Sequence, residues 1–374
     1  MRIGIVCYPT LGGSGIVATE LGQTLAKDGH DVHFITYEVP FRLKVEDPRI
    51  HFHKVEINRY DLFEYPDYAL TLAVKIAQVS DQYQLDILHV HYAIPHATSA
   101  YLAKQLTRTC KPAIITTLHG TDITLVGKDP AYSEIVKFSI GHSDRVTAVS
   151  NDLAKTTRDF FHIDEPIEVI HNFFIPDKEL IGKKPMRGNF VNAEEKLFCH
   201  SSNFRSVKRA EDVIKIFHLV NKQLPSKLLL LGTGPQIEDV HHLVKDLQLE
   251  KDVYFLGKQI EVDPYIASSD LVLLPSSQES FGLVALEAMA YGVPVIATKT
   301  GGLPEVVLHE STGFLAPVGD IELMSDYALK VLSDDELYKK MSMSCIERSS
   351  QEFSVDKILP KYLEVYKQAR ESIC

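Results

Sequence analysis

The pattern of apolar and polar positions divides the chain into two halves, and each half alternates strands with helices. Short apolar runs predict buried strands, and apolar residues at helical spacing predict the helices between them. This alternation predicts a parallel, doubly wound α/β sheet in the first half. Its predicted strands are 3–7, 32–36, 50–55, 87–90, 113–117, 145–149 and 167–170, and its helices are 15–27, 68–81, 95–106, 132–141 and 152–161.

Residues 176–195 lose this periodicity and gain charge, Gly and Pro, which predicts a linker with a surface loop. The alternation then restarts. A chain of 374 residues with two such halves predicts two Rossmann-like domains that face a cleft, over 1–172 and 173–353, followed by an amphipathic helix over 354–374. The second set of strands is predicted at 197–200, 228–231, 253–256 and 271–274, with helices at 210–223 and 236–247.

The composition of the chain argues against several classes of protein. Lys and Arg number 39 against 50 Asp and Glu, and the net charge of −11 argues against a general nucleic-acid binder. No apolar run reaches membrane-spanning length and no signal peptide opens the chain, so we expect a cytoplasmic protein without stable membrane insertion. Five scattered cysteines without a CxxC pair predict reduced thiols: Cys7, Cys110, Cys199, Cys345 and Cys374.

Residues 278–305 contain several features that are typical of a ligand-binding site. A strand ends just before Glu279, a glycine turn at Gly282 precedes a helix, and a second glycine turn follows the next strand. Free N–H groups at a helix start suit a diphosphate, and in open α/β sheets ligands bind at the carboxyl ends of strands. Glu287 lies one turn, about 5.4 Å, beyond Leu283 and could hold a ribose. The competing interpretation is two exposed glutamates on an ordinary amphipathic helix.

A glycine loop near the N-terminus supports an alternative function. Gly13, Gly15 and Ala18 form a GxGxxA pattern before a helix, and Glu38 follows the second predicted strand. This pattern is typical of a dinucleotide site, which would make the protein an NAD-dependent enzyme. However, the glycines lie several residues beyond the first strand, whereas the usual fingerprint turns immediately. A second partial match, at 232–234, lacks a third glycine.

The motifs at 279–287, 292–297 and 301–305, in this order, resemble the donor-binding signature of retaining GT-B glycosyltransferases of family 4. The resemblance extends over almost the whole chain and implies a C-terminal helix that crosses back to the first domain. Stretches 7–15, 119–124 and 202–209 resemble members that transfer N-acetylglucosamine from UDP-N-acetylglucosamine to the hydroxyl of L-malate, the first step of bacillithiol synthesis. No DxD motif stands out, so we expect no metal or other cofactor. The sequence sets no oligomeric state, and a homo-oligomer is compatible with it.

The resemblance also implies roles for individual residues. Lys208 would neutralise the diphosphate, while Arg205 could serve either a phosphate or the acceptor carboxylate, because this chain has Asn203 where many members have Arg. His119 would contact the transferred sugar, and Glu279 would orient it. His89 and His91 alternate along a strand, and we interpret His89 as structural. The nucleotide set is Gly13, Lys208, Gln259, Ile260, Phe281, Gly282, Leu283, Val284 and Glu287, and the acceptor set is Ser14, Tyr92, Asn151 and Arg205.

Two alternatives stay open on these residues besides the NAD-dependent enzyme. The protein could use another acceptor, or it could bind a sugar nucleotide without catalysis. At Asn151, capping of the helix that starts there is an equal alternative to acceptor binding.

Overall fold

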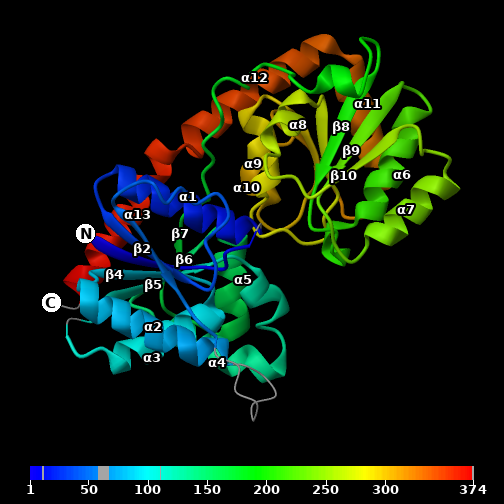
Figure 1. Ribbon diagram of the computed structural model, residues 1–374. Coiled ribbons are helices and arrows are strands. Elements are labelled where there is room, and N and C mark those ends of the chain that lie inside the picture. The colour runs from blue at the N-terminus through cyan, green and yellow to red at the C-terminus, as the bar shows by residue number, and fades with distance from the viewer. Residues whose placement is uncertain (11, 58–66, 110, 373–374) are drawn as a thin grey trace. The chain divides into compact units, whose positions relative to one another are not determined.

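The computed structural model describes residues 1–10, 12–57, 67–109 and 111–372 (Figure 1). The chain forms two compact units, the first made of Met1–Asn172 with Val355–Cys374 and the second of Phe173–Ser354. These bounds differ from the predicted domains only at Ser354, which was expected in the returning segment and belongs to the second unit.

The first unit contains a seven-stranded parallel sheet in the order β3-β2-β1-β4-β5-β6-β7. Helices α2 and α3 pack together on one face, and α1 packs with α13 on the other (Figure 1). The strands are β1 Arg2–Val6, β2 Asp31–Thr36, β3 Ile50–Lys54, β4 Ile87–His91, β5 Ala113–Leu118, β6 Arg145–Ala148 and β7 Glu168–Val169. The helices are α1 Gly13–Lys27, α2 Tyr68–Tyr83, α3 Thr98–Leu106, α4 Pro130–Gly141, α5 Asn151–Phe161 and α13 Val355–Glu371.

The second unit contains a six-stranded parallel sheet in the order β10-β9-β8-β11-β12-β13. The strands are β8 Lys196–Ser201, β9 Ser226–Leu231, β10 Val253–Gly257, β11 Leu271–Leu274, β12 Val295–Thr298 and β13 Gly313–Ala316. The helices are α6 Ala210–Asn221, α7 Ile237–Asp246, α8 Asp263–Ser268, α9 Leu283–Ala290, α10 Leu303–Val306, α11 Ile321–Ser333 and α12 Asp335–Glu352.

The predicted strands agree with these bounds within two residues, because buried parallel strands are continuous apolar runs. The predicted helix 95–106 is wrong at its start: α3 begins at Thr98, and Ala93–Ala97 form a kinked turn in which Ile94 has an extended backbone. Helices α8, α11 and α12 are not among the predicted elements. In the predicted linker, the only regular element is the 3₁₀ turn Arg187–Asn189.

Helix α13 follows the second unit in sequence and packs on the first. Tyr362 and Tyr366 on this helix are buried, and the Tyr366 hydroxyl lies 2.7 Å from the Nδ1 of His89 on β4. Arg370 pairs with Asp86 just before β4 at 3.6 Å. The helix therefore crosses back as the family resemblance implied, and His89 has the structural environment expected for it.

The strand order reverses once in each sheet. In the first unit β1 lies between β2 and β4, and in the second β8 lies between β9 and β11. In an open parallel sheet, ligands bind at the carboxyl ends of the strands where the strand order reverses. Residues after β1 and β4, and after β8 and β11, are therefore the natural ligand positions of each unit.

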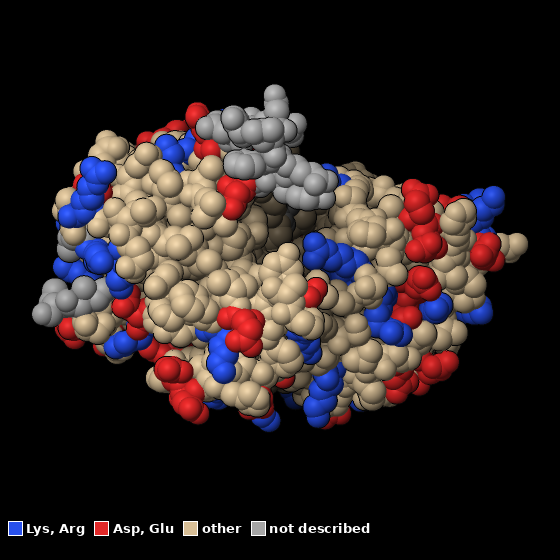
Figure 2. All heavy atoms as spheres, turned by 90° about the horizontal axis from the view of Figure 1, so that it is seen from below, with Lys and Arg blue, Asp and Glu red and all other residues tan. Residues whose placement is uncertain are grey.

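Charged side chains of both signs are interspersed over the face drawn in Figure 2. In the part of the chain that the structure describes, no helix combines the length and apolar character needed to cross a membrane.

Candidate active site

An ion pair between Lys208 and Glu279 lies at the strand-order reversal of the second unit. Lys208 ends the 3₁₀ turn Ser206–Lys208 after β8, and Glu279 follows β11. Lys208 Nζ lies 2.6 Å from Glu279 Oε2, and the side chains are 23% and 17% exposed. Because β8 and β11 are adjacent, the sheet brings together two predicted residues that are 71 positions apart.

Arg205 is a second cation beside this turn, and its side chain is exposed. Within the described ranges it makes no ion pair or side-chain hydrogen bond, whereas Arg209 is held by Asp212 with Nε and Oδ2 2.6 Å apart. Arg205 thus keeps its full set of guanidinium donors for an anionic ligand.

Two glycine turns pack directly against each other at the start of α9. Gly282 has φ 96°, and a Cβ atom there would lie 2.7 Å from a methyl carbon of Leu303. A Cβ on Gly301 would lie 1.9 Å from the Glu279 carbonyl oxygen, which accepts a hydrogen bond from Gly302 N–H at 2.8 Å. Only glycine permits this approach. The packing fixes the first turn of α9, whose initial N–H groups, including those of Leu283 and Val284, have no acceptor within the helix.

Glu287 and Phe281 are both buried, at 4% and 3% exposure. The competing interpretation of exposed glutamates is therefore wrong for Glu287. A buried carboxylate is costly unless hydrogen bonds compensate it, so this burial favours a specific role. The Phe281 ring packs edge-to-face on Phe353 with centroids 5.8 Å apart. The Phe281 side chain thus belongs to the packing of the second unit, which leaves its backbone as the part that could contact a nucleotide.

Gln259 and Ile260, both predicted to bind the nucleotide, follow β10 at the edge of the sheet. The Gln259 side chain donates to the Leu256 carbonyl oxygen at 2.5 Å, and Ile260 is 72% exposed. Gly232 and Gly234, which follow the neighbouring strand β9, have a packing role that was not predicted. A Cβ on Gly232 would lie 1.9 Å from the Ser202 carbonyl oxygen, and one on Gly234 would lie 1.8 Å from that of Asn203. The GxG spacing therefore reflects the close packing of two loops.

Ser14 and Tyr92, both predicted acceptor ligands, come together at the strand-order reversal of the first unit. Their hydroxyl oxygens are 2.7 Å apart, and the contact is partly buried. Tyr92 has φ 91°, a conformation that is strained for a residue with a Cβ and that clusters at functional sites. Gly13, the first residue of α1, is exposed beside Ser14.

His119 follows β5 in the first unit and is half-buried. Its Nε2 lies 2.8 Å from Nδ1 of His91, and burial lowers the pKa of His119 to about 3, so the ring is neutral near pH 7. Asp122, which the sequence analysis did not select, is buried and accepts hydrogen bonds from Ala93 N–H at 2.9 Å and Gly120 N–H at 3.0 Å. Burial raises the pKa of Asp122 to about 6. Asp122 thus fastens the loops after β4 and β5 to each other.

Asn151 is the first residue of α5 and is exposed. The capping alternative for Asn151 is wrong, because the Ser150 side chain caps this helix and accepts from Leu153 N–H at 3.1 Å.

The structure brings together Lys208 and Glu279 in the second unit, and Ser14, Tyr92 and His119 in the first. Asn151 follows β6, and Gln259 and Ile260 follow β10, at other strands of the two sheets. Among the described residues, no group of three or more His, Cys, Asp or Glu side chains is arranged to hold a metal ion. Cys7, Cys199 and Cys345 are free and buried, while Cys110 and Cys374 lie outside the described residues.

Comparison with known proteins places both units in one family. The model of Glycosyltransferase Family 4 matches residues 11–178, and that of Glycosyl transferases group 1 matches residues 183–348. A relative from Bacillus anthracis, N-acetyl-alpha-D-glucosaminyl L-malate synthase, is 47% identical over 98% of this chain and 96% of its own.

Solved structures share the fold over nearly the whole chain. Anabaena HepE in complex with UDP and glucose has a TM-score of 0.83 at 20% identity and covers 98% of this chain and 99% of its own. Sucrose-phosphate synthase from Thermosynechococcus elongatus has a TM-score of 0.80 at 21% identity, with 100% of both chains covered.

The NAD-dependent alternative does not fit these findings. Residues 7–12 separate β1 from α1, so the chain lacks the immediate turn of a dinucleotide fingerprint. The two family models and the relative from Bacillus anthracis agree along the chain, which therefore belongs to family 4 of the glycosyltransferases and has the GT-B fold.

Proposed function

We propose that the protein transfers N-acetylglucosamine from UDP-N-acetylglucosamine to the hydroxyl of L-malate with retention at the anomeric carbon, the first step of bacillithiol synthesis. The observation that carries this proposal is the 47% identity to the L-malate synthase of Bacillus anthracis over 98% of the chain. The site chemistry supports an anionic, sugar-bearing donor, and the named relative supports the acceptor.

The donor diphosphate would bind at the start of α9, where N–H groups and the helix dipole favour an anion. Lys208 contacts Glu279, and a phosphate in this position would compete with that carboxylate for its ammonium group. Glu287 would hold the ribose. As the anomeric C–O bond breaks, negative charge develops on the diphosphate, and these fixed donors would stabilise it.

The malate hydroxyl oxygen would attack the anomeric carbon on the face from which the diphosphate leaves. The new C–O bond would form as the old one breaks, and a leaving phosphate oxygen would take the hydroxyl proton. Glu279 would orient the sugar, released from Lys208 when the diphosphate binds. The proposal requires no metal or other cofactor.

Malate carries two carboxylates, so its pocket needs hydrogen-bond donors. Ser14 and Tyr92 share a hydrogen bond, and because a hydroxyl can both donate and accept, both side chains offer hydrogen-bonding groups suited to malate. Arg205, with no internal carboxylate among the described residues, supplies a positive charge for either the malate carboxylate or the diphosphate.

We also propose a cytoplasmic location. The three described cysteines are free thiols, which is typical of proteins kept in a reducing compartment.

The test is to incubate the protein with UDP-N-acetylglucosamine and a panel of hydroxy acids while UDP release is measured. We expect release with L-malate, and a product with the α configuration by NMR. Release only with another hydroxy acid would contradict the proposed acceptor and keep the family reaction. Binding of UDP without turnover of any acceptor would instead indicate the non-catalytic alternative.

A further inference from the structure

His91 and His119 form a hydrogen-bonded pair at the carboxyl ends of β4 and β5. His91 is the last residue of β4 and is completely buried, whereas His119 is half-buried. The distance from His91 Nδ1 to His119 Nε2 is 2.8 Å. The ring of Tyr92 lies against His119, with centroids 5.3 Å apart. His91 therefore contacts a predicted catalytic residue from the interior of the unit.

The partners of the other ring nitrogens indicate where the protons lie. His91 Nε2 is buried and has no hydrogen-bond partner in the described structure. A buried N–H without an acceptor is rarer than a buried acceptor without a donor, so the proton of His91 belongs on Nδ1. His91 then donates to His119 Nε2. A neutral imidazole carries one N–H, so His119 must hold its own proton on Nδ1.

His96 resembles His91 in that its Nδ1 is hydrogen-bonded while its buried Nε2 has no partner among the described residues. His96 Nδ1 lies 2.5 Å from the His91 carbonyl oxygen, which can only accept, and its buried Nε2 has no partner within the described part of the chain. Burial lowers the pKa of His91 well below its ordinary value, that of His119 to about 3 and that of His96 to about 4. All three rings are therefore neutral near pH 7, and each carries a single proton.

We propose that His91 is a positioning residue that holds His119 in the tautomer protonated on Nδ1, so that His119 presents an N–H donor to an oxygen of the bound sugar. Among the described residues His119 Nδ1 has no hydrogen bond, and it is the nitrogen left for a ligand. The identity of the ligand rests on the proposed function, whereas the tautomer follows from the buried contacts alone.

The chain contains a matched control in a different part of the same unit. His33 on β2 is buried, and its Nδ1 lies 2.9 Å from Nε2 of His53 on the edge strand β3. The bond joins the same two atom types as in the His91 pair, and no residue predicted to bind the sugar nucleotide or the acceptor follows these two strands. Loss of this bond affects packing without affecting a ligand donor.

The tautomer is measured by NMR of the full-length protein with ¹⁵N-labelled histidine, with His119 and His91 resonances assigned from the variants H119N and H91N. We expect His119 to be protonated on Nδ1 and unprotonated on Nε2. Protonation of His119 on Nε2 would overturn the proposal. This readout needs no activity, so it holds even if L-malate is not the acceptor.

The kinetics of the variants H91N and H91L distinguish a positioning role of His91 from a role in packing alone. The asparagine amide introduced by H91N lies near the position of the imidazole Nδ1 and can keep the bond to His119, whereas the leucine of H91L cannot. We expect H91L to lower kcat by roughly tenfold with an unchanged Kd for UDP, and H91N to restore most of the rate. H33L should change the melting temperature but not kcat. Equal loss of kcat in H91N and H91L, or none in H91L, would contradict the proposal.

Discussion

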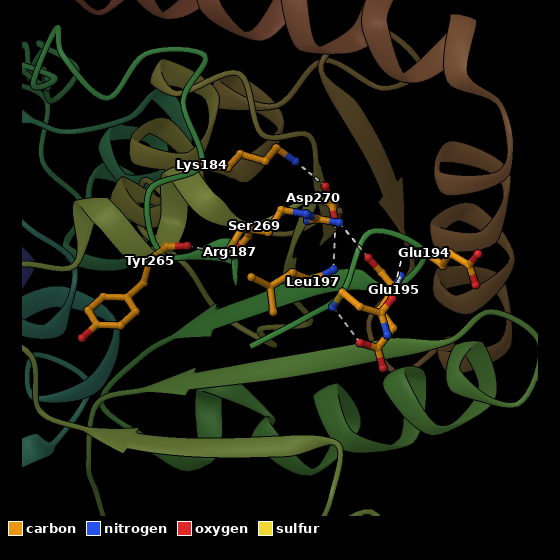
Figure 3. Close-up of polar contacts among 9 residues, drawn as sticks. Lys184, Arg187, Glu194, Glu195, Leu197, Tyr265, Ser269 and Asp270 are labelled. Carbon is orange, nitrogen blue, oxygen red and sulfur yellow. Dashed lines mark hydrogen bonds and ion pairs between the residues drawn. The ribbon is translucent and has the colours of Figure 1, made fainter. Parts of the chain in front are cut away.

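Two clusters of charged side chains lie at opposite ends of the neighbouring strands β8 and β11. At the amino end, Asp270 precedes β11 and is 8% exposed; it contacts Lys184, Arg187 Nη1 at 2.5 Å and the Leu197 N–H at 2.8 Å (Figure 3). At the carboxyl end, Lys208 contacts Glu279. The two clusters contain the same kinds of charge and differ in how completely the chain itself satisfies them.

In the amino-end cluster, Asp270 is already paired with cations and an N–H group of the chain itself. Arg187 also donates to the Glu195 carbonyl oxygen at 2.7 Å, so the linker that carries Lys184 and Arg187 is fastened to the start of the sheet (Figure 3). Burial alone would raise the pKa of Asp270, but Lys184, the Leu197 N–H and Arg187 outweigh it and hold the pKa below its ordinary value. This cluster therefore contributes to stability.

The carboxyl-end cluster leaves donors available. Arg205 has no carboxylate partner among the described residues, and the first N–H groups of α9 have no acceptor in the helix. An anion can therefore gain hydrogen bonds at this end that the protein does not already make. The comparison shows that completeness of pairing, more than charge itself, separates a structural cluster from a ligand site.

The largest effect is expected for K208A. Loss of a preorganised cation at a developing charge lowers kcat by on the order of 10²–10³-fold, about 3–4 kcal/mol. Stability should change by less than about 1 kcal/mol, because the pair is partly exposed. The matched control is K227A, since Lys227 contacts Asp252 at 2.7 Å with similar exposure. A K208A enzyme with the kcat of K227A would remove the distinction between the clusters.

The variant D270A should lose stability and keep its affinity for UDP, whereas K208A should lose activity and keep its stability. Removal of the carboxylate leaves two cations and the Leu197 N–H without their acceptor, which costs about 3 kcal/mol of unfolding free energy. Denaturant unfolding measures this loss, and the Kd for UDP should be unchanged. D252A, which breaks the more exposed pair with Lys227, should cost about 1 kcal/mol or less. Weaker UDP binding in D270A would show that the two ends are coupled.

The variant E287Q tests whether Glu287 binds the ribose of the nucleotide. The amide keeps the shape of the buried side chain and removes its charge, so the Kd for UDP should rise roughly tenfold, the loss of one charged hydrogen bond. Isothermal titration calorimetry measures this change. E211Q, on the exposed surface of α6, is the control and should bind UDP as the wild type does. An unchanged Kd in E287Q would discredit the ribose role.

The smallest expected effect is a dependence of the unfolding free energy on pH. The pKa of Asp270 is lowered in the folded protein, so its stabilising contribution is present above the unfolded pKa of about 3.9 and is lost as pH falls through the folded value. The stability difference between wild type and D270N should therefore shrink as pH falls from about 5 to about 3, by at most about 1.4 kcal/mol per pH unit. Unfolding in urea at several pH values measures it, and a difference independent of pH would contradict the pairing.

The parallel strands, the pattern of two domains and the residues at the strand ends could be predicted from the sequence. Continuous apolar runs and helical spacing are local, so they predicted β1 to β11 within two residues. The motif around Glu279 identified the donor class because glycine turns and helix starts carry their chemistry in a few consecutive positions. The same reasoning missed α11 and α12, and it did not predict the burial of Glu287.

Which of these residues contact each other depends on the packing of segments that are distant in the chain. Lys208 and Glu279, Ser14 and Tyr92, and His91 and His119 are each brought together by strand order, which local periodicity does not encode. The parallel pairing of β8 and β11 places the Asp270 cluster at the amino ends of these strands and the Lys208 pair at their carboxyl ends, where ligands bind in open α/β sheets. Whether a charge stabilises the fold or serves a ligand therefore depended on packing between distant segments.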